Sequence, residues 1–364
     1  MPRVVIAGYH GFGNLGDEAI LQATLCEFRR LAPEVEFTVL SRDPAWTSGA
    51  YRVRSALRID PRQVIKELRA AQMFLLGGGS LLQDMTSLRS LMYYAGLLWI
   101  GKKLTGKAMV FANGIGPITT PLGRALSRTA LNGADLITLR DPDSAQTLKE
   151  LGVDRQPIVT ADPAFLLEPE PVEGQPDPFQ AEGIPPAQGP RIVVSVRLFR
   201  NAAVGFRELA RALDSVVETR KAQVVMVPMH RTMDLEPSRQ VLALMKRPGF
   251  VLQRQYSPGQ VLYMLAKCNA VLGTRLHSLV LGVTALVPTA GIVYDPKVES
   301  FLRELGCPCA GSLWDLNARD VVSAVEELLD RSSTIRGQLQ RAKGRLVPLA
   351  RKNVELALDL LYRR

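Results

Sequence analysis

The chain has 364 residues and a formal net charge of +10, from 45 lysines and arginines against 35 aspartates and glutamates. This length is long for a single hydrophobic core and predicts two domains. The basic residues are spread over many predicted helices rather than gathered in a stripe with aromatic residues, which argues against a nucleic-acid partner. An anionic substrate or a peripheral contact with an anionic membrane surface fits this charge, and so does an ordinary arginine-rich solvated surface.

Two further features indicate a cytoplasmic protein. The apolar run from Val4 to Gly8 is too short for a signal peptide. The longest apolar stretch, Leu91 to Ile100, contains two tyrosines and is followed by lysines, so it falls short of a membrane span. The four cysteines lack the spacing of a zinc site and suggest reduced thiols. We therefore expect a cytoplasmic location, with the inner face of the cell membrane as an option, and neither a metal nor a cofactor.

Strands and helices alternate in the first half, as in a parallel sheet covered by helices. Strands are predicted at 3–8, 35–40, 72–76, 108–112, 134–139 and 158–160. Helices are predicted from the end of the first loop to 31 and at 60–70, 87–104, 122–131 and 142–151.

The loop after the first strand matches the dinucleotide pattern through Gly11, Gly13 and Gly16. Asp17 and Glu18 follow in the first helical turn, where they suit the helix dipole but would repel a pyrophosphate. Asn14, Gly16 and Asp17 are instead predicted to bind sugar hydroxyls. Helix capping explains Asp17 equally well.

Small or charged residues end further strands of this half. Gly78 and Gly79 follow the third strand and permit close approach by a ligand or by another backbone, and the sequence leaves both open. Arg140 and Asp141 follow the fifth strand. These loops share one edge of the predicted sheet and are expected to line a cleft.

The composition changes between 167 and 190, where seven prolines predict an interdomain linker that builds no core. The predicted domains are therefore 1–166 and 191–340, with a C-terminal helix at 341–364. In the second domain, strands are predicted at 191–196, 223–227, 250–252, 270–272 and 285–290. Helices are predicted at 205–219, from 237, at 258–266, from 276, after 297, at 316–329 and at 333–362.

The stretch from Val271 to Ala285 places Arg275 and His277 between a buried strand and an apolar helix. Parallel sheets bind ligands there, and a helix start favours anions. A guanidinium adds a fork for phosphate or carboxylate, and an imidazole adds a group for proton transfer. The simpler interpretation pairs Arg275 with a carboxylate and makes His277 a cap. His230 and Arg231 end another strand and could join this site, although surface turn residues are the safer interpretation.

Several motifs together resemble the polysaccharide pyruvyl transferase family, over essentially the full length. They are Gly13-Asn14-Leu15-Gly16-Asp17-Glu18-Ala19, Gly77-Gly78-Gly79, Leu139-Arg140-Asp141, Ser195-Val196-Arg197, Arg275-Leu276-His277-Ser278 and Tyr294-Asp295-Pro296-Lys297. The match looks closest to bacterial enzymes that put a pyruvate ketal on a cell-wall polysaccharide, such as a secondary cell wall polymer that anchors an S-layer.

The resemblance implies an α/β fold of two Rossmann-like, doubly wound domains, as in GT-B glycosyltransferases, with the active site in the interdomain cleft. It also implies phosphoenolpyruvate as co-substrate and a 4,6-ketal on a hexose such as N-acetylmannosamine, carried on a membrane lipid. The donor-site residues that it implies are Arg140, Arg275, His277 and Lys297, to which we add Arg197. The acceptor residues predicted from the first-domain loops are Asn14, Gly16, Asp17, Gly78 and Gly79.

The chemistry then suggests roles. Arg140, Arg275 and Lys297 would compensate the phosphate and carboxylate, and His277 would be the acid or proton shuttle. Asp17 or Glu18 would be the acceptor-side base. The alternative function is a GT-B-type glycosyltransferase with a nucleotide sugar, because fold alone does not set the reaction. A non-catalytic carbohydrate-binding or assembly protein is a third interpretation. The acceptor sugar, the ketal stereochemistry and the oligomeric state stay open.

Overall fold

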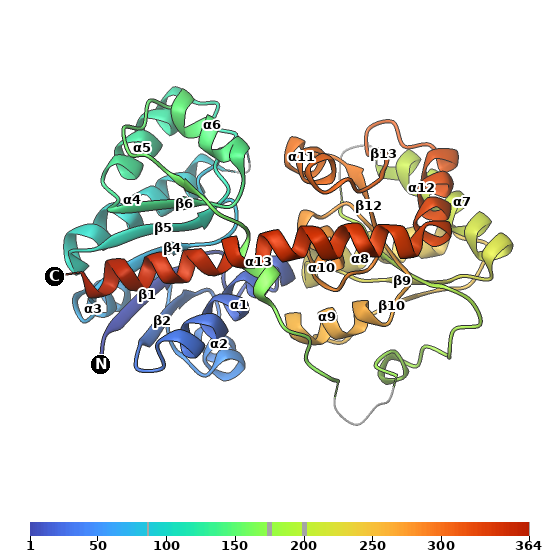
Figure 1. Ribbon diagram of the computed structural model, residues 1–364, viewed down its shortest axis with the longest axis horizontal. Helices are drawn as coiled ribbons and strands as arrows, with labels where there is room; N and C mark the ends of the chain where they lie inside the picture. The colour runs from blue at the N-terminus through green and yellow to red at the C-terminus, as the bar shows by residue number, and fades with distance from the viewer. Residues whose placement is uncertain (86, 173–176, 199–201, 364) are drawn as a thin grey trace. The chain divides into compact units, whose positions relative to one another are not determined.

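A computed structural model describes residues 1–85, 87–172, 177–198 and 202–363. The chain divides into two compact units (Figure 1). Unit 1 comprises residues 1–166 together with 345–364, and unit 2 comprises residues 167–344. Each unit is built around one parallel sheet, so the predicted pair of doubly wound α/β domains is confirmed.

The sheet of unit 1 has seven parallel strands in the order β3-β2-β1-β4-β5-β6-β7. The strands are β1 (Arg3–Ala7), β2 (Glu36–Ser41), β3 (Arg54–Leu57), β4 (Met73–Gly77), β5 (Ala108–Asn113), β6 (Leu136–Leu139) and β7 (Ile158–Val159). The helices are α1 (Leu15–Leu31), α2 (Pro44–Tyr51), α3 (Pro61–Arg69), α4 (Leu88–Thr105), α5 (Pro121–Asn132) and α6 (Pro142–Glu150). The strand order reverses between β1 and β4, where open α/β sheets bind their ligands.

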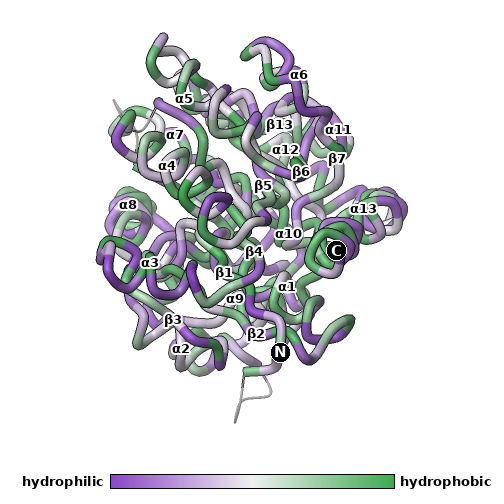
Figure 2. The backbone as a smooth tube through the Cα atoms, turned by 90° about the vertical axis from the view of Figure 1, so that its left-hand side faces the viewer, coloured by the Kyte–Doolittle hydropathy of each residue, from purple (hydrophilic) through white to green (hydrophobic). Residues whose placement is uncertain are grey.

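The core of unit 1 lies on both faces of this sheet. Alternate strand residues point to opposite faces, so Val5 belongs to a core cluster with residues of α3, α4, α5 and α6. Val4 belongs to a second cluster, with residues of α1, α2 and the end of the last helix. The helices carry both hydrophobic and hydrophilic turns, as Figure 2 shows for α3 and α4. Both faces of the sheet are thereby covered, and the loops at the strand ends hold the polar side chains.

Unit 2 has six parallel strands in the order β10-β9-β8-β11-β12-β13. The strands are β8 (Arg191–Ser195), β9 (Gln223–Met226), β10 (Gly249–Val251), β11 (Ala270–Gly273), β12 (Thr289–Val293) and β13 (Cys309–Ser312). The helices are α7 (Ala202–Arg220), α8 (Arg231–Leu244), α9 (Pro258–Ala266), α10 (Leu276–Thr284), α11 (Pro296–Leu305) and α12 (Ala318–Asp330). The reversal of strand order falls between β8 and β11.

Some elements differ from the sequence prediction. Helix α2 and strands β3 and β13 were not predicted. Helix α8 begins at Arg231, so the predicted start at Pro237 is wrong and this proline lies inside the helix. The strand predicted at 285–290 is β12 at Thr289–Val293, because Leu286 has a positive φ of 59° in the turn after α10.

The proline-rich segment contributes to the core, contrary to the prediction. Phe179 and Ile184 are buried within unit 2. The Glu182 carboxylate accepts hydrogen bonds from the backbone N–H groups of Gln253 and Arg254, both at 2.9 Å. The part of the predicted linker at 173–176 lies outside the described residues.

The last helix, α13 (Ser332–Tyr362), belongs to both units. Its residues from 345 onward join unit 1, where Val354, Ala357 and Leu360 pack in the core. Asn353 is fully buried and its side chain donates to the carbonyl of Ala161 at 3.0 Å. The end of the chain is thus part of the first unit rather than an appendage.

Candidate functional site

The polar residues of unit 2 gather at the carboxyl ends of four neighbouring strands, β9, β8, β11 and β12. His230 follows β9, Arg197 follows β8, Arg275 follows β11 and Lys297 follows β12. The ends of the two central strands, β8 and β11, are connected by a hydrogen bond, in which the Thr274 N–H donates to the Ser195 carbonyl at 2.9 Å. This edge is where a doubly wound sheet binds ligands.

The turn that carries Arg275 and His277 requires a glycine before it. A Cβ added to Gly273 would lie 2.1 Å from the Ser278 hydroxyl oxygen. That hydroxyl donates to the Arg275 carbonyl at 2.6 Å and closes the start of α10. Arg275 is the extended N-cap residue, and His277 lies half-buried in the first turn of the helix.

Arg275 forms a two-pronged ion pair with a residue that sequence analysis missed. Its Nε and Nη2 donate to the two carboxylate oxygens of Asp234, at 2.9 and 2.5 Å. Asp234 is fully buried in the first turn of α8, and its carboxylate also accepts the backbone N–H of His230 at 2.9 Å. The carboxylate pairing that the simpler interpretation gave to Arg275 is therefore present. The Asp234 carboxylate compensates the charge of Arg275 and fixes the plane of its guanidinium.

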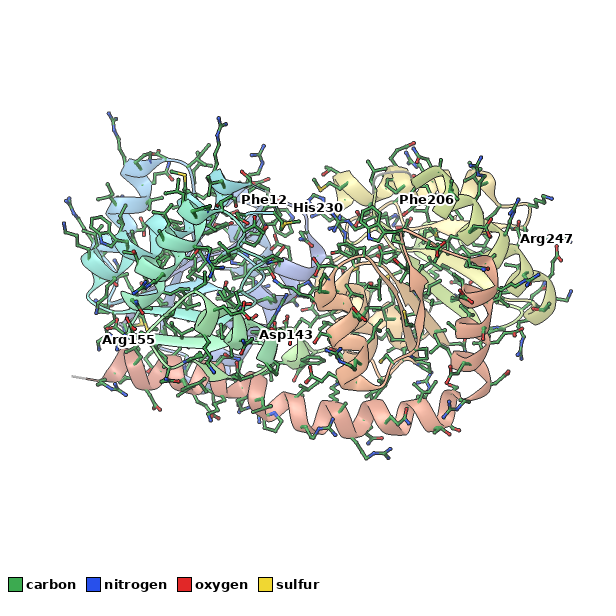
Figure 3. The ribbon with its side chains drawn as sticks, turned by 90° about the horizontal axis from the view of Figure 1, so that it is seen from above. Phe12, Asp143, Arg155, Phe206, His230 and Arg247 are labelled. Atoms are coloured by element: carbon green, nitrogen blue, oxygen red, sulfur yellow. The ribbon has the colours of Figure 1, made fainter. Side chains whose placement is uncertain are left out.

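His230 lies against this ion pair and is labelled in Figure 3. Only 5% of it is exposed, so its interpretation as a surface turn residue is wrong. Burial lowers the pKa of the imidazole, and the nearby Arg275 charge lowers it further. Both effects favour the neutral form of the ring. Its neighbour Arg231 is exposed and donates to the Gln255 side chain at 2.7 Å.

The loops after β8 and β12 meet through an aromatic contact. The Arg197 guanidinium lies 4.4 Å from the centre of the Tyr294 ring. Asp295, the next residue, caps α11 by accepting the Lys297 N–H at 2.9 Å. Arg197 thus lies on the loop after β8 and Lys297 in the first turn of α11, and both are half-buried.

Arg140 belongs to unit 1, and the charge of its guanidinium is also compensated by a carboxylate. Its Nη1 donates to Asp162 at 2.9 Å, and both side chains are only 6% exposed. Its Nη2 donates to the Ser80 hydroxyl at 3.1 Å, and Asp141 lies 3.7 Å from its Nε. The Arg140 guanidinium is therefore ion-paired within unit 1. A role for it beside the unit 2 residues stays a prediction.

The predicted acceptor residues come together at the β1–β4 reversal. Asn14 caps α1 by accepting the Gly16 N–H at 3.2 Å and donates to the Asp17 carboxylate at 2.5 Å. Gly78 and Gly79 adopt positive φ values of 56° and 73°. A Cβ on Gly79 would lie 2.6 Å from Asp17 Oδ1, and one on Gly78 would clash with Ile20. The two glycines therefore allow the loop after β4 to approach the start of α1.

Glu18 is a buried carboxyl that hydrogen-bonds to the loop after β1. Its carboxylate is 3% exposed and accepts hydrogen bonds from the Gly11 N–H at 2.7 Å and the Tyr51 hydroxyl at 2.8 Å. Burial raises the pKa of this carboxyl to about 7, although both hydrogen bonds oppose the rise. The predicted role of Glu18 or Asp17 as a base stays a prediction.

The raised pKa of Glu18 predicts a stability that falls with pH. Because the folded-state pKa lies above the unfolded value, the stabilising contribution is complete below about pH 4.5 and is lost as the pH rises through about 7. We expect Glu18→Gln, which stays neutral, to be more stable than wild type at pH 8 by at most about 3 kcal/mol. Thermal unfolding between pH 5 and 8 measures this, and the difference should close near pH 5.

The matched control for this experiment is Glu355→Gln, at an exposed glutamate of α13. It should show no pH-dependent difference from wild type. A Glu18→Gln effect of constant size at every pH would contradict the assignment of the raised pKa.

An aromatic stack that sequence analysis also missed supports the same loop. The rings of Tyr9 and Phe12 are stacked at 3.9 Å between centroids. The Arg58 guanidinium lies 5.0 Å from the Phe12 ring and 4.3 Å from the Tyr93 ring. Arg58 comes from the segment after β3, an unpredicted strand, so no local signal pointed to this contact.

Comparison with known proteins identifies the family. The model of the family "Polysaccharide pyruvyl transferase" matches residues 14–296, a span that contains Arg140, Arg197, Arg275 and His277 and ends one residue before Lys297. The chain belongs to the polysaccharide pyruvyl transferase family. A relative, the amylovoran biosynthesis protein AmsJ of Erwinia amylovora, is 21% identical over 398 aligned residues, covering 93% of this chain and 95% of that protein.

Solved structures share the fold of this family member. A putative UDP-N-acetylglucosamine 2-epimerase from Listeria monocytogenes has a TM-score of 0.68 at 14% identity, with 98% of this chain and 95% of that chain covered. A glycosyltransferase from Rickettsia africae has a TM-score of 0.66 at 10% identity, with 100% and 99% covered. The predicted GT-B-like architecture is confirmed. These identities are too low to carry an activity across.

The described residues add two observations on chemistry and location. Among them, no group of histidine, cysteine and acidic side chains is arranged to hold a metal ion. Within the same ranges, no helix combines the length and the hydropathy of a membrane span.

Proposed function

We propose that this pyruvyl transferase family member moves the pyruvyl group of phosphoenolpyruvate onto a hexose, with release of phosphate. The acceptor proposed is N-acetylmannosamine of a lipid-linked cell-wall polysaccharide precursor, and the product is its 4,6-ketal. The observation that carries the proposal is the Arg275-Leu276-His277 turn, within the family match, at the strand edge that also holds Arg197 and Lys297. The reaction would take place in the cytoplasm, at the inner face of the membrane.

The donor needs a site for two anionic groups, a phosphate and a carboxylate. Asp234 occupies one edge of the Arg275 guanidinium through Nε and Nη2, so the remaining N–H groups are oriented for one anionic group. Lys297 and Arg197 would bind the other, with backbone N–H groups at the start of α10. Arg140, which is held by Asp162, is the remaining residue that we propose for donor binding.

The reaction forms two C–O bonds to the central carbon of the donor. His277 gives a proton to the methylene carbon, which becomes a methyl group, and positive charge develops at the central carbon. One sugar hydroxyl attacks there and loses its proton to a base. The second hydroxyl then displaces phosphate, and its proton leaves with the phosphate as hydrogen phosphate. Protons and charges balance, and no oxidant is required.

The acceptor would bind at the first-unit loops. Asn14, Gly16, Gly78 and Gly79 present an amide and several backbone groups where the two loops approach, which suits sugar hydroxyls. Asp17 borders Gly79 and is the proposed base that takes the hydroxyl proton. Glu18, buried behind the loop, would keep the loop in place.

A ligand-binding experiment tests the donor. We expect phosphoenolpyruvate to raise the melting temperature, by an amount equivalent to about 2.7 kcal/mol at a concentration 100 times its Kd, because only a ligand of the folded state stabilises it. Arg275→Lys should reduce this shift, since an ammonium cannot form the fork that Asp234 orients. The exposed Arg231→Ala is the control and should keep the shift.

Phosphate release decides between the proposed reaction and its main competitor. Release from phosphoenolpyruvate should depend on a lipid-linked N-acetylmannosaminyl acceptor. A melting-temperature rise with a nucleotide sugar, together with no release for any pyranose acceptor, would favour a glycosyltransferase instead. Sugar binding without any phosphate release would favour a carbohydrate-binding protein.

A further inference from the structure

Two neighbouring helices of unit 1 carry basic residues and no acidic ones. Helices α4 and α5 contain no aspartate or glutamate, although the whole chain has 35 of them. They pack side by side over the same face of the sheet. Their basic residues are Arg89, Lys102, Lys103, Arg124 and Arg128. Lys102 forms an ion pair with Asp135 at 2.6 Å, so the other four supply the positive charge of this pair of helices.

The same side exposes large apolar residues. Arg89, Met92, Gly96, Trp99 and Lys103 recur at intervals of three and four residues, which places them along one ridge of α4. Trp99 is 57% exposed and Met92 48%, while Leu122 at the start of α5 is 51% exposed. We call Arg89, Met92, Trp99, Lys103 and Leu122 the α4–α5 face.

These apolar residues do not serve the core. The opposite side of α4 fills the core with Leu91, Tyr94 and Leu98, all buried to 1% exposure or less. The Lys103 ammonium lies 5.2 Å from the centre of the Trp99 ring. Tryptophan beside lysine is the pairing that the headgroup region of a bilayer favours, because each side chain has an apolar body and a polar end.

We propose that the α4–α5 face binds the surface of an anionic lipid bilayer. Trp99, Met92 and Leu122 would enter the boundary between headgroups and acyl chains, and the arginines and lysines would contact lipid phosphates. Charge complementarity favours this partner, because the charged side chains of the two helices are all basic. The lysines and arginines of a protein partner of mixed charge would find no carboxylate on these helices to pair with. Single-stranded nucleic acid binds in a groove of stacked aromatic rings, whereas this face has one tryptophan among flexible aliphatic side chains.

This inference does not depend on the proposed reaction, because it uses neither the donor nor the acceptor residues. The test is co-sedimentation of the full chain with phosphatidylcholine vesicles that contain or lack phosphatidylglycerol. Binding should require phosphatidylglycerol. Each basic residue near an anionic surface strengthens binding about fivefold, so the double variant Arg89→Glu, Lys103→Glu should bind at least about 25-fold more weakly. Trp99→Ser should also weaken binding.

The matched control is Trp314→Ser with Arg319→Glu in unit 2, which removes a tryptophan that is 66% exposed and reverses one charge elsewhere. It should bind vesicles like wild type. Equal binding of wild type and the Arg89→Glu, Lys103→Glu variant would overturn the proposal, as would binding to phosphatidylcholine alone. A change of oligomeric state in Trp99→Ser, seen by sedimentation velocity without lipid, would show that a second copy covers this face and would also overturn it.

The activity of the same variants separates this inference from the proposed function. Phosphate release with a water-soluble acceptor should be unchanged in all three variants, since none alters a residue of the proposed site. Loss of vesicle binding with full activity on that acceptor supports the membrane surface. Unimpaired vesicle binding in the variants counts against the membrane surface, whatever the acceptor measurements show about pyruvyl transfer.

Discussion

Replacing His277 by glutamine is expected to lower acceptor-dependent phosphate release about 10²–10⁴-fold, the usual contribution of a general acid. The reaction must deliver a proton to carbon, and His277 is the imidazole in the first turn of α10 beside Arg275. Glutamine keeps a hydrogen-bond donor but cannot deliver a proton. The loss should therefore fall on kcat, with a smaller change in KM for phosphoenolpyruvate. Steady-state phosphate release measures both quantities.

Chemical rescue provides the control for His277. His277→Ala should lose the same activity and regain part of it when imidazole is added, because imidazolium is a small acid that can enter the space left by the side chain. The exposed Arg231→Ala should keep the wild-type rate with and without imidazole. A His277→Gln enzyme that retains most of the wild-type kcat would remove this residue from the proton-transfer step.

The largest effect on stability is expected at Asp234. Asp234→Ala leaves the Arg275 guanidinium, only 17% exposed, without its counter-charge. Breaking a buried ion pair in this way typically costs about 3–5 kcal/mol. Urea unfolding followed by Trp314 fluorescence, in a Trp46→Phe, Trp99→Phe background, would report unit 2 alone, since the chain has 3 tryptophans.

A double-mutant cycle separates the ion pair from the loss of packing. Asp234→Ala combined with Arg275→Met should cost less than the sum of the single changes, because removing both charges leaves neither one buried without a partner. If the losses of unfolding free energy in the two single variants add up to the loss in the double variant, the two side chains have no interaction energy and the ion pair does not stabilise the fold. Arg231→Met, an exposed arginine whose partner is Gln255, should add independently to Asp234→Ala.

Features encoded in short apolar runs and glycine positions could be predicted from the sequence. Helix α9 begins and ends as predicted at Pro258 and Ala266, because Ser257 caps it and proline opens it. Gly78, Gly79 and Gly273 mark the strand ends where side chains would clash. Strand β3, at Arg54–Leu57, could not be found, since an edge strand with two apolar residues carries little periodicity.

The residues that compensate the arginines could not be predicted. Pro237 was taken as a helix start, although α8 begins six residues earlier, so Asp234 was not placed on the first turn of a helix beside the site. The Ser238 hydroxyl bonds the Asp234 carbonyl at 2.7 Å inside this helix. Asp234 and Arg275 are 41 residues apart, and Arg140 and Asp162 are 22 apart. Pairing over such distances depends on tertiary structure, and periodicity does not report it.

The division of α13 between the units has a consequence for synthesis and engineering. Unit 2 is a continuous insertion into unit 1, whose core needs Val354, Ala357 and Leu360 from the far end of the chain. During translation, the inserted unit is complete before the unit that precedes it. Expression of residues 1–166 alone would expose the apolar surface of unit 1 on which Val354, Ala357 and Leu360 pack. A fragment that joins 166 to 345 through a short connector would cover this surface.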